Sequence, residues 1–124
     1  MEGHIKVPFS MLVAGSRMAG KSQFTKNLLL SGMIIPDVKK IYWIYKTWQN
    51  MFSELRNLNI EFIQDLPNDF DSMTNSLIVF DDMMQEASNS EQVQSLFTRG
   101  RHLNISVIFL TQNFIKENIV ETFL

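Results

Sequence analysis

Short apolar runs alternate along the chain with segments whose apolar residues recur every three or four positions. The runs are typical of strands and lie at residues 10–14, 40–45, 60–63, 77–80 and 105–110. They are nearly continuous, as expected for parallel strands that are covered on both faces. Helical spacing follows at residues 24–30, 51–58, 91–97 and 115–123. The alternation predicts an α/β fold with a mainly parallel sheet, whose ligand sites lie beyond the carboxyl ends of the strands.

The third helical segment carries its own start and stop signals. Ser88, followed three residues later by Glu91, matches a capping box and predicts a helix start at Ser88. Gly100 is predicted to end this helix, before the last strand begins.

Composition and charge exclude several classes of protein. The 124 residues are 45% apolar and 19% charged, which is typical of one globular domain. Eleven basic against thirteen acidic residues give a net charge of -2, so any contact with nucleic acid must be local. The absence of cysteine excludes disulfides, Cys-ligated metal centres and a thiol nucleophile. No signal-peptide core and no membrane-spanning run is found, which predicts a soluble, intracellular protein without a membrane partner.

A phosphate-binding motif lies between the first strand and the first helix. The pattern G-x-x-x-x-G-K-[ST] is matched by Gly15, Ser16, Arg17, Met18, Ala19, Gly20, Lys21 and Ser22. In such a loop, backbone N–H groups and a helix N-terminus surround the phosphates. Lys21 is expected to reach the β and γ phosphates, and the Ser22 hydroxyl to bind Mg²⁺. A chance match in a turn is the alternative, but the flanking strand and helix favour the phosphate-binding loop.

Two adjacent carboxylates follow the most apolar strand. Asp81 is expected to hold Mg²⁺, and Asp82 to orient and deprotonate the attacking water. An exchange of the two roles is equally compatible with the sequence. An acidic pair after a strand is also a common turn or helix cap, and the phosphate-binding motif upstream is what favours the catalytic interpretation.

The last strand is flanked by further candidate residues. Gln112 follows it, where an amide could contact both water and the γ-phosphate; capping of the next helix is the alternative. Arg99 and Arg101 precede it, and either could serve as an arginine finger for a neighbouring subunit or contact DNA phosphates. The alternative is a solvated helix end whose cations complement the helix dipole.

Four aromatic residues in and after the second strand admit two interpretations. Tyr42, Trp43, Tyr45 and Trp48, with neighbouring lysines, could form a platform for nucleic acid. Packing in the core is the favoured interpretation, because a strand buries alternate rings. Trp48 lies beyond the strand and is expected to be exposed near the site.

Taken together, the motifs GSRMAGKS, LIVFDD and LFTRGRHLNISVIFLTQN resemble those of the viral genome-packaging ATPases of the FtsK/HerA superfamily. Such enzymes occur in poxvirus-like large DNA viruses, virophages and Polinton/Maverick elements, and YKTWQNMFSELRNLNIEFIQDLP resembles a segment of the Polinton-type members. The resemblance implies a three-layer P-loop NTPase fold of the ASCE type. It also implies ATP and Mg²⁺ as cofactors, a homo-oligomeric ring, translocation of double-stranded DNA, and capsid or portal proteins as partners.

The resemblance carries over by position. Lys21 and Ser22 match the phosphate and Mg²⁺ contacts, Asp81 and Asp82 the acidic pair, and Gln112 the sensor; Arg99 and Arg101 only weakly identify a finger. Family members continue past the sensor strand, which predicts a single P-loop domain over residues 1–124 that is truncated there. A P-loop nucleotide kinase and a truncated nucleotide-binding module without turnover are the alternatives.

Overall fold

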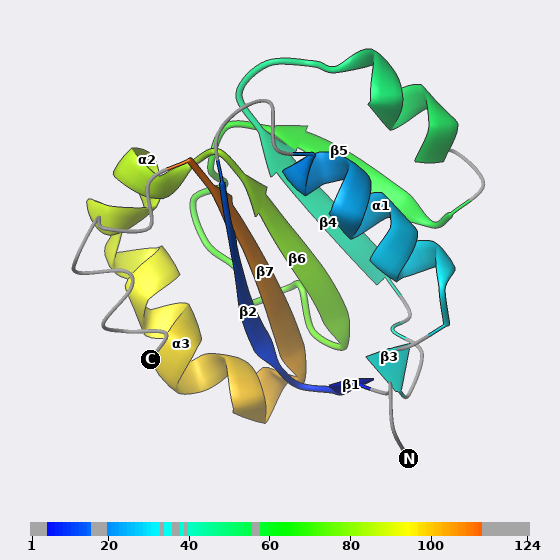
Figure 1. The fold of residues 1–124 in the computed structure, drawn as a ribbon. Helices are drawn as coiled ribbons and strands as arrows, with labels where there is room; N and C mark the ends of the chain where they lie inside the picture. Colours follow the sequence, from blue (N-terminus) through cyan, green and yellow to red (C-terminus); the bar gives the residue numbers. More distant parts are fainter. Residues whose placement is uncertain are drawn as a thin grey trace.

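A parallel five-stranded sheet forms the centre of the computed structural model, which describes residues 5–15, 20–32, 34–35, 38, 40–55 and 58–112. In spatial order the strands are β2 (Ser10–Ala14), β7 (Ile105–Thr111), β6 (Ser76–Asp81), β4 (Lys40–Tyr45) and β5 (Ile60–Gln64) (Figure 1). Every pairing in this sheet is parallel. The predicted α/β fold and all five predicted strands are therefore confirmed.

The order of the strands identifies the type of α/β fold. β7 lies between β2, which leads into the phosphate-binding motif, and β6, which carries the acidic pair. A strand inserted at this position is the defining feature of the ASCE type of P-loop fold. Ala14 pairs with Thr111, and Asp81 with Leu110, so the carboxyl ends of β2, β7 and β6 lie at one edge of the sheet.

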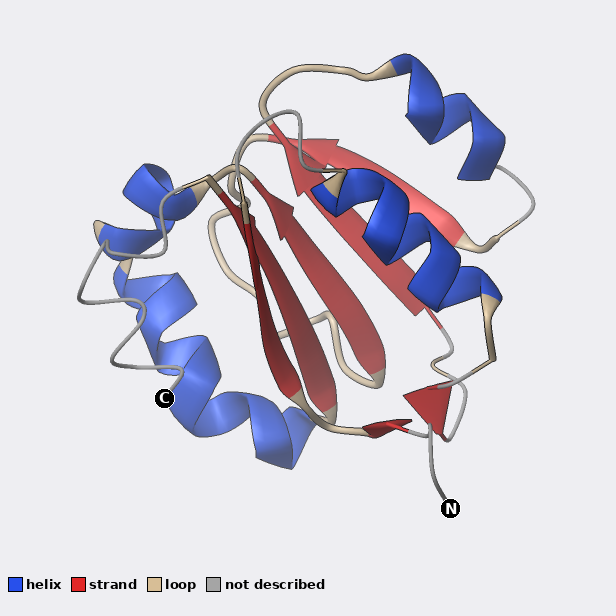
Figure 2. Ribbon diagram, viewed as in Figure 1, coloured by secondary structure: helices blue, strands red, loops and turns tan. Residues whose placement is uncertain are grey.

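Helices cover both faces of the sheet and complete three layers (Figure 2). On one face lie α1 (Lys21–Leu30) and the 3₁₀ helix η2 (Asn50–Leu55). On the other lie α2 (Met84–Ser88) and α3 (Glu91–Leu103). β6 and β7 are buried along their whole length because they are central and covered twice. A two-stranded parallel pair, β1 (Ile5–Lys6) with β3 (Ile34–Ile35), stands apart from the sheet.

Aromatic rings fill the core on both sides of the sheet. Trp43 is fully buried and packs against Phe52 of η2, with 5.4 Å between ring centroids. On the opposite face Phe80 stacks on Phe109 at 5.2 Å. Trp48 is 46% exposed. The interpretation of these aromatics as core residues is thus confirmed for Trp43, and the expected exposure of Trp48 is also found.

The start and the end of α3 differ from the prediction. Ser88 lies at the end of α2, a short helix that the periodicity does not reveal, and Ser90 caps α3 by accepting a hydrogen bond from the Val93 N–H at 3.2 Å. Gly100 lies inside the helix, at the small cost that glycine has there. The helix ends at Leu103 and is capped by Asn104, whose φ of 56° is a left-handed conformation that asparagine tolerates.

The segment after β4 also differs from the prediction of an α-helix over residues 51–58. It forms the 3₁₀ helix η2, whose buried residues Phe52 and Leu55 are three positions apart. A spacing of three matches the 3₁₀ repeat. The helix predicted over residues 115–123 lies outside the described residues. No helix in the described part of the chain is long and apolar enough to span a membrane.

Candidate functional site

A cavity of about 690 Å³ opens at the carboxyl edge of the sheet. The residues that line it come from the start of α1 and from the segments that follow β4, β6 and β7: Gly20, Lys21, Ser22, Gln23, Tyr45, Lys46, Thr47, Gln49, Asp81, Asp82 and Gln112. Segments that are far apart in the sequence therefore meet where a parallel sheet is expected to bind its ligand.

The described part of the phosphate-binding motif lies on one side of this cavity. Gly20 has a φ of 80°, a left-handed conformation that favours glycine, and α1 begins directly after it at Lys21. The Lys21 ammonium donates to the Gly15 carbonyl at 2.8 Å, and the Gly15 N–H donates to the Thr111 carbonyl at 3.1 Å. The N-terminus of α1 thus faces the cavity, where the positive end of the helix dipole favours an anion. Residues 16–19 of the predicted motif lie outside the described residues.

Asp81 is held at the end of β6 by two donors that the sequence did not suggest. The indole Nε1–H of Trp43 donates to Oδ2 at 3.0 Å, and the Gln49 amide donates to the same oxygen at 3.2 Å. Only 6% of Asp81 is exposed. Burial raises the pKa of its carboxyl group, and the neighbouring Asp82 adds to the rise, while the Trp43 hydrogen bond and the charge of Lys21 oppose it.

Asp82 and Gln112 meet across the ends of β6 and β7. The Asp82 backbone has a φ of 60°, and its N–H donates to the Leu110 carbonyl at 3.0 Å. The Gln112 amide donates to Oδ2 of Asp82 at 3.0 Å. The two adjacent carboxylates therefore have different surroundings: Asp81 is buried and bonded towards β4, whereas Asp82 contacts the predicted sensor residue.

Lys46 and Glu86 form an ion pair beside the cavity that sequence reasoning missed. Lys46 follows β4 and lines the cavity, while Glu86 belongs to α2. The Glu86 carboxylate raises the pKa of Lys46. Partial burial alone would raise the pKa of Glu86, but the hydrogen bond from Lys46, a backbone hydrogen bond and the charge of Lys46 together outweigh it, so the net pKa is lowered. No sequence pattern links the two residues, because the pair depends on β4 and β6 being neighbours.

Comparison with known proteins shows which family the sequence matches. The sequence matches the family described as "Poxvirus A32 protein" over residues 49–120, more than half of the chain. The chain belongs to the poxvirus A32 protein family. The matched segment includes both carboxylates and Gln112, and it begins after the phosphate-binding motif. No curated protein matches the sequence.

A solved structure shares the fold of this A32-family chain. It is described as the cytoplasmic domain of EssC and superposes with a TM-score of 0.63 at 17% sequence identity. The likeness covers 93% of the present chain but 29% of that one, so the A32-family chain spans less than a third of its length. At this identity the likeness shows a common fold.

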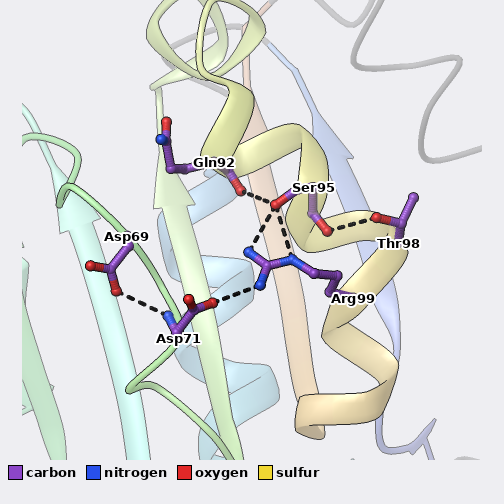
Figure 3. Close-up of polar contacts among 6 residues, drawn as sticks. All are labelled: Asp69, Asp71, Gln92, Ser95, Thr98 and Arg99. Carbon is purple, nitrogen blue, oxygen red and sulfur yellow. Dashed lines mark hydrogen bonds and ion pairs between the residues drawn. The ribbon is translucent and has the colours of Figure 1, made fainter.

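The two arginines predicted as finger candidates are not among the described residues that line the cavity. Arg99 lies on α3 and is held by Asp71, with 2.9 Å between Nη1 and Oδ1, and by the Ser95 hydroxyl at 3.0 Å from Nη2 (Figure 3). Arg101, in the last turn of α3, is grouped with Pro8 and Phe9 around a small hollow near the start of β2. In the A32-family chain, a finger role for either residue therefore requires a second subunit.

The exposed pair of Arg99 and Asp71 provides a test of that role. Breaking an exposed ion pair costs about 0–1 kcal/mol of stability. We therefore expect Arg99→Gln and Asp71→Asn to lower the melting temperature slightly and equally, as measured by circular dichroism. A loss of nucleotide turnover in Arg99→Gln that Asp71→Asn does not share would assign Arg99 a role beyond the pair. Equal turnover in both variants would leave it a purely structural residue.

Proposed function

We propose that this chain is the ATP-hydrolysing core of a motor that packages double-stranded viral DNA into a capsid. The observation that carries the proposal is the convergence of Lys21, Asp81, Asp82 and Gln112 on one cavity. Membership of the poxvirus A32 family and the resemblance to FtsK/HerA-type packaging ATPases support the choice of ATP as the nucleotide and of double-stranded DNA as the partner.

The donors at this edge suit a magnesium nucleotide. Mg²⁺ prefers oxygen ligands and is usually held by one or two protein oxygens together with phosphates and water. The Ser22 hydroxyl and the Asp81 carboxylate are oxygens of this kind. The described residues contain no cluster of three or more metal-ligating His, Cys, Asp or Glu side chains, so a metal held by protein ligands alone is not favoured there.

The surroundings of the two carboxylates favour one assignment of their roles. Asp81, fixed by Trp43 and Gln49, has the rigid position that a metal contact requires, and in our proposal it holds Mg²⁺ with Ser22. Asp82 orients the attacking water and accepts its proton. Gln112, already bonded to Asp82, would sense the change of charge during hydrolysis.

Lys21 and the N-terminus of α1 complete the phosphate site. Lys21 neutralises the β and γ phosphates, and the N–H groups of α1 and of the loop before it surround them. The loop is the segment Ser16, Arg17, Met18 and Ala19, whose role stays a prediction. A homo-oligomeric ring, double-stranded DNA and capsid or portal proteins are the partners that this function requires.

The alternative of a nucleotide kinase receives no support from a specific observation. It would need an acceptor pocket and an arginine-bearing lid, and the segment from Asp82 to Gln112 consists of α2, α3 and β7. The non-hydrolysing nucleotide-binding module differs from the motor in turnover, which the following experiment measures.

The decisive measurement is phosphate release from Mg-ATP by the 124-residue chain, with and without double-stranded DNA. We expect release that DNA stimulates, and a loss of at least about 100-fold in Lys21→Ala, because one strong charge contact to the transferring phosphoryl group is removed. The chain with Lys26→Ala serves as a control, since Lys26 lies on the same helix and pairs with Glu54. Nucleotide binding without release would favour the non-hydrolysing module, and transfer of phosphate to added nucleosides would favour the kinase.

A further inference from the structure

Two cations line the described part of the cavity, Lys21 and Lys46, and the phosphate-binding motif accounts for the first alone. We propose that Lys46 is a second phosphate-binding residue, which contacts the terminal phosphate of the bound nucleotide and pairs with Glu86 when that phosphate is absent. The inference rests on the proposed function and adds a residue that discriminates nucleoside triphosphate from diphosphate.

The backbone at Lys46 is anchored at the end of β4. The Gln64 side-chain amide donates to the Lys46 carbonyl at 3.2 Å, and the Asp65 N–H donates to the Tyr45 carbonyl at 2.9 Å. Because β4 is hydrogen-bonded to β6, this anchoring fixes Lys46 next to the strand that carries the two catalytic candidates. A side chain on such a rigid base can change partner without movement of the sheet.

The charges around Lys46 favour such an exchange of partners. The Lys46 ammonium pairs with Glu86, and the charges of Asp65 and Asp82 also raise its pKa. The Lys46 side chain is 54% exposed and that of Glu86 is 33% exposed, so their pair contributes little to stability. A terminal phosphate carries more negative charge than a carboxylate and accepts stronger charge-assisted hydrogen bonds. Lys46 is therefore held near the cavity by a partner that a triphosphate can displace.

The position of the two arginines strengthens the inference. Phosphoryl transfer needs cations around the transferring group, and neither Arg99 nor Arg101 lines this cavity. Among the described residues that line the cavity, the cations are Lys21 and Lys46. The Lys46 side chain comes from the β4 side, whereas Lys21 comes from α1.

A purely structural role makes a different prediction. If Lys46 served only to hold α2 through Glu86, removal of either partner would have the same effect. If Lys46 binds phosphate, Glu86→Gln should leave the binding of triphosphate intact or tighten it, because the competing carboxylate is gone. The two variants thus separate the two roles.

The test is calorimetric titration of the full chain with the magnesium complexes of ADP and of a non-hydrolysable ATP analogue. We expect Lys46→Gln to weaken binding of the analogue about 10- to 100-fold, the range expected for a lost charged hydrogen bond, and binding of ADP less than about 2-fold. Lys46→Arg should recover most of the loss. Lys40→Gln is the matched control, because Lys40 lies at the other end of β4 and pairs with Glu61 at 3.6 Å; it should bind both nucleotides like the parent.

Several outcomes would overturn the inference. These are equal weakening of ADP and analogue in Lys46→Gln, unchanged binding of both, or the same loss in Glu86→Gln as in Lys46→Gln. Melting curves check the fold, and Lys46→Met, which keeps the aliphatic stem, repeats the test if Lys46→Gln is destabilised. A parent chain that binds neither nucleotide would refute the proposed function itself, which distinguishes that failure from a failure of the Lys46 assignment.

Discussion

The Asp82→Asn variant should bind Mg-ATP with nearly parental affinity and hydrolyse it about 10²- to 10⁴-fold more slowly, the range expected for loss of a general base. Asparagine has the shape of aspartate but cannot accept the proton of the attacking water. It also tolerates the left-handed backbone at this position, where φ is 60°, so the fold should be preserved. Single-turnover phosphate release, together with nucleotide binding, measures the two quantities separately.

The role of Asp82 as the base can be tested against a control variant and can be refuted by one result. Asp69→Asn removes the same charge from an exposed loop, where Asp69 accepts a hydrogen bond from the Asp71 N–H, and this variant should turn over nucleotide like the parent. Parental turnover in Asp82→Asn would refute its assignment as the base. A loss of Mg²⁺-dependent binding would instead mean that Asp82 contacts the metal and that the roles of Asp81 and Asp82 are exchanged.

The strands were predictable because their burial leaves a direct trace in the sequence. A strand covered on both faces has no solvent side, so β6 and β7 consist mainly of apolar residues, and the predicted runs at 77–80 and 105–110 come within one residue of the observed bounds. Short helices leave no such trace. α2 has five residues and buries Met84 and Ala87, which is too few positions to show a period. Ser88 and Ser90 are chemically identical cap candidates, and only the path of the chain decides between them.

The same distinction holds for the site. The place of Lys21, Asp81 and Asp82 at one edge of the sheet was predictable, because each lies beside a motif or a strand end in the sequence, while their roles stay predictions. The bonds from Trp43 and Gln49 to Asp81, and the pair of Lys46 with Glu86, were not. They depend on β4 being the neighbour of β6 in space, and the sequence does not contain the order of strands in a sheet.

Asp81→Asn should abolish Mg²⁺-dependent nucleotide binding and raise the melting temperature of the nucleotide-free chain by a few degrees at neutral pH. Burial raises the pKa of Asp81 above the ordinary value of 3.8 because it disfavours the charged carboxylate. The folded state therefore binds this proton more tightly than the unfolded state. The free energy of unfolding loses this contribution as the pH rises from 3.8 through the raised pKa, and at neutral pH the charged Asp81 is a net cost. Asparagine removes the charge, and its side-chain oxygen can still accept from Trp43.

The difference in melting temperature between Asp81→Asn and the parent should therefore shrink as the solution is acidified below the ordinary carboxyl pKa, where Asp81 is neutral in both the folded and the unfolded chain. In the presence of Mg-ATP at neutral pH, the parent should have the higher melting temperature of the two chains. A ligand at 100 times its dissociation constant adds about 2.7 kcal/mol to the stability of a chain that binds it, and the variant would not gain this. Equal stabilisation of both chains by Mg-ATP would remove Asp81 from the metal site. If the difference in melting temperature did not depend on pH, the lower stability of the parent would not be caused by burial of the Asp81 charge.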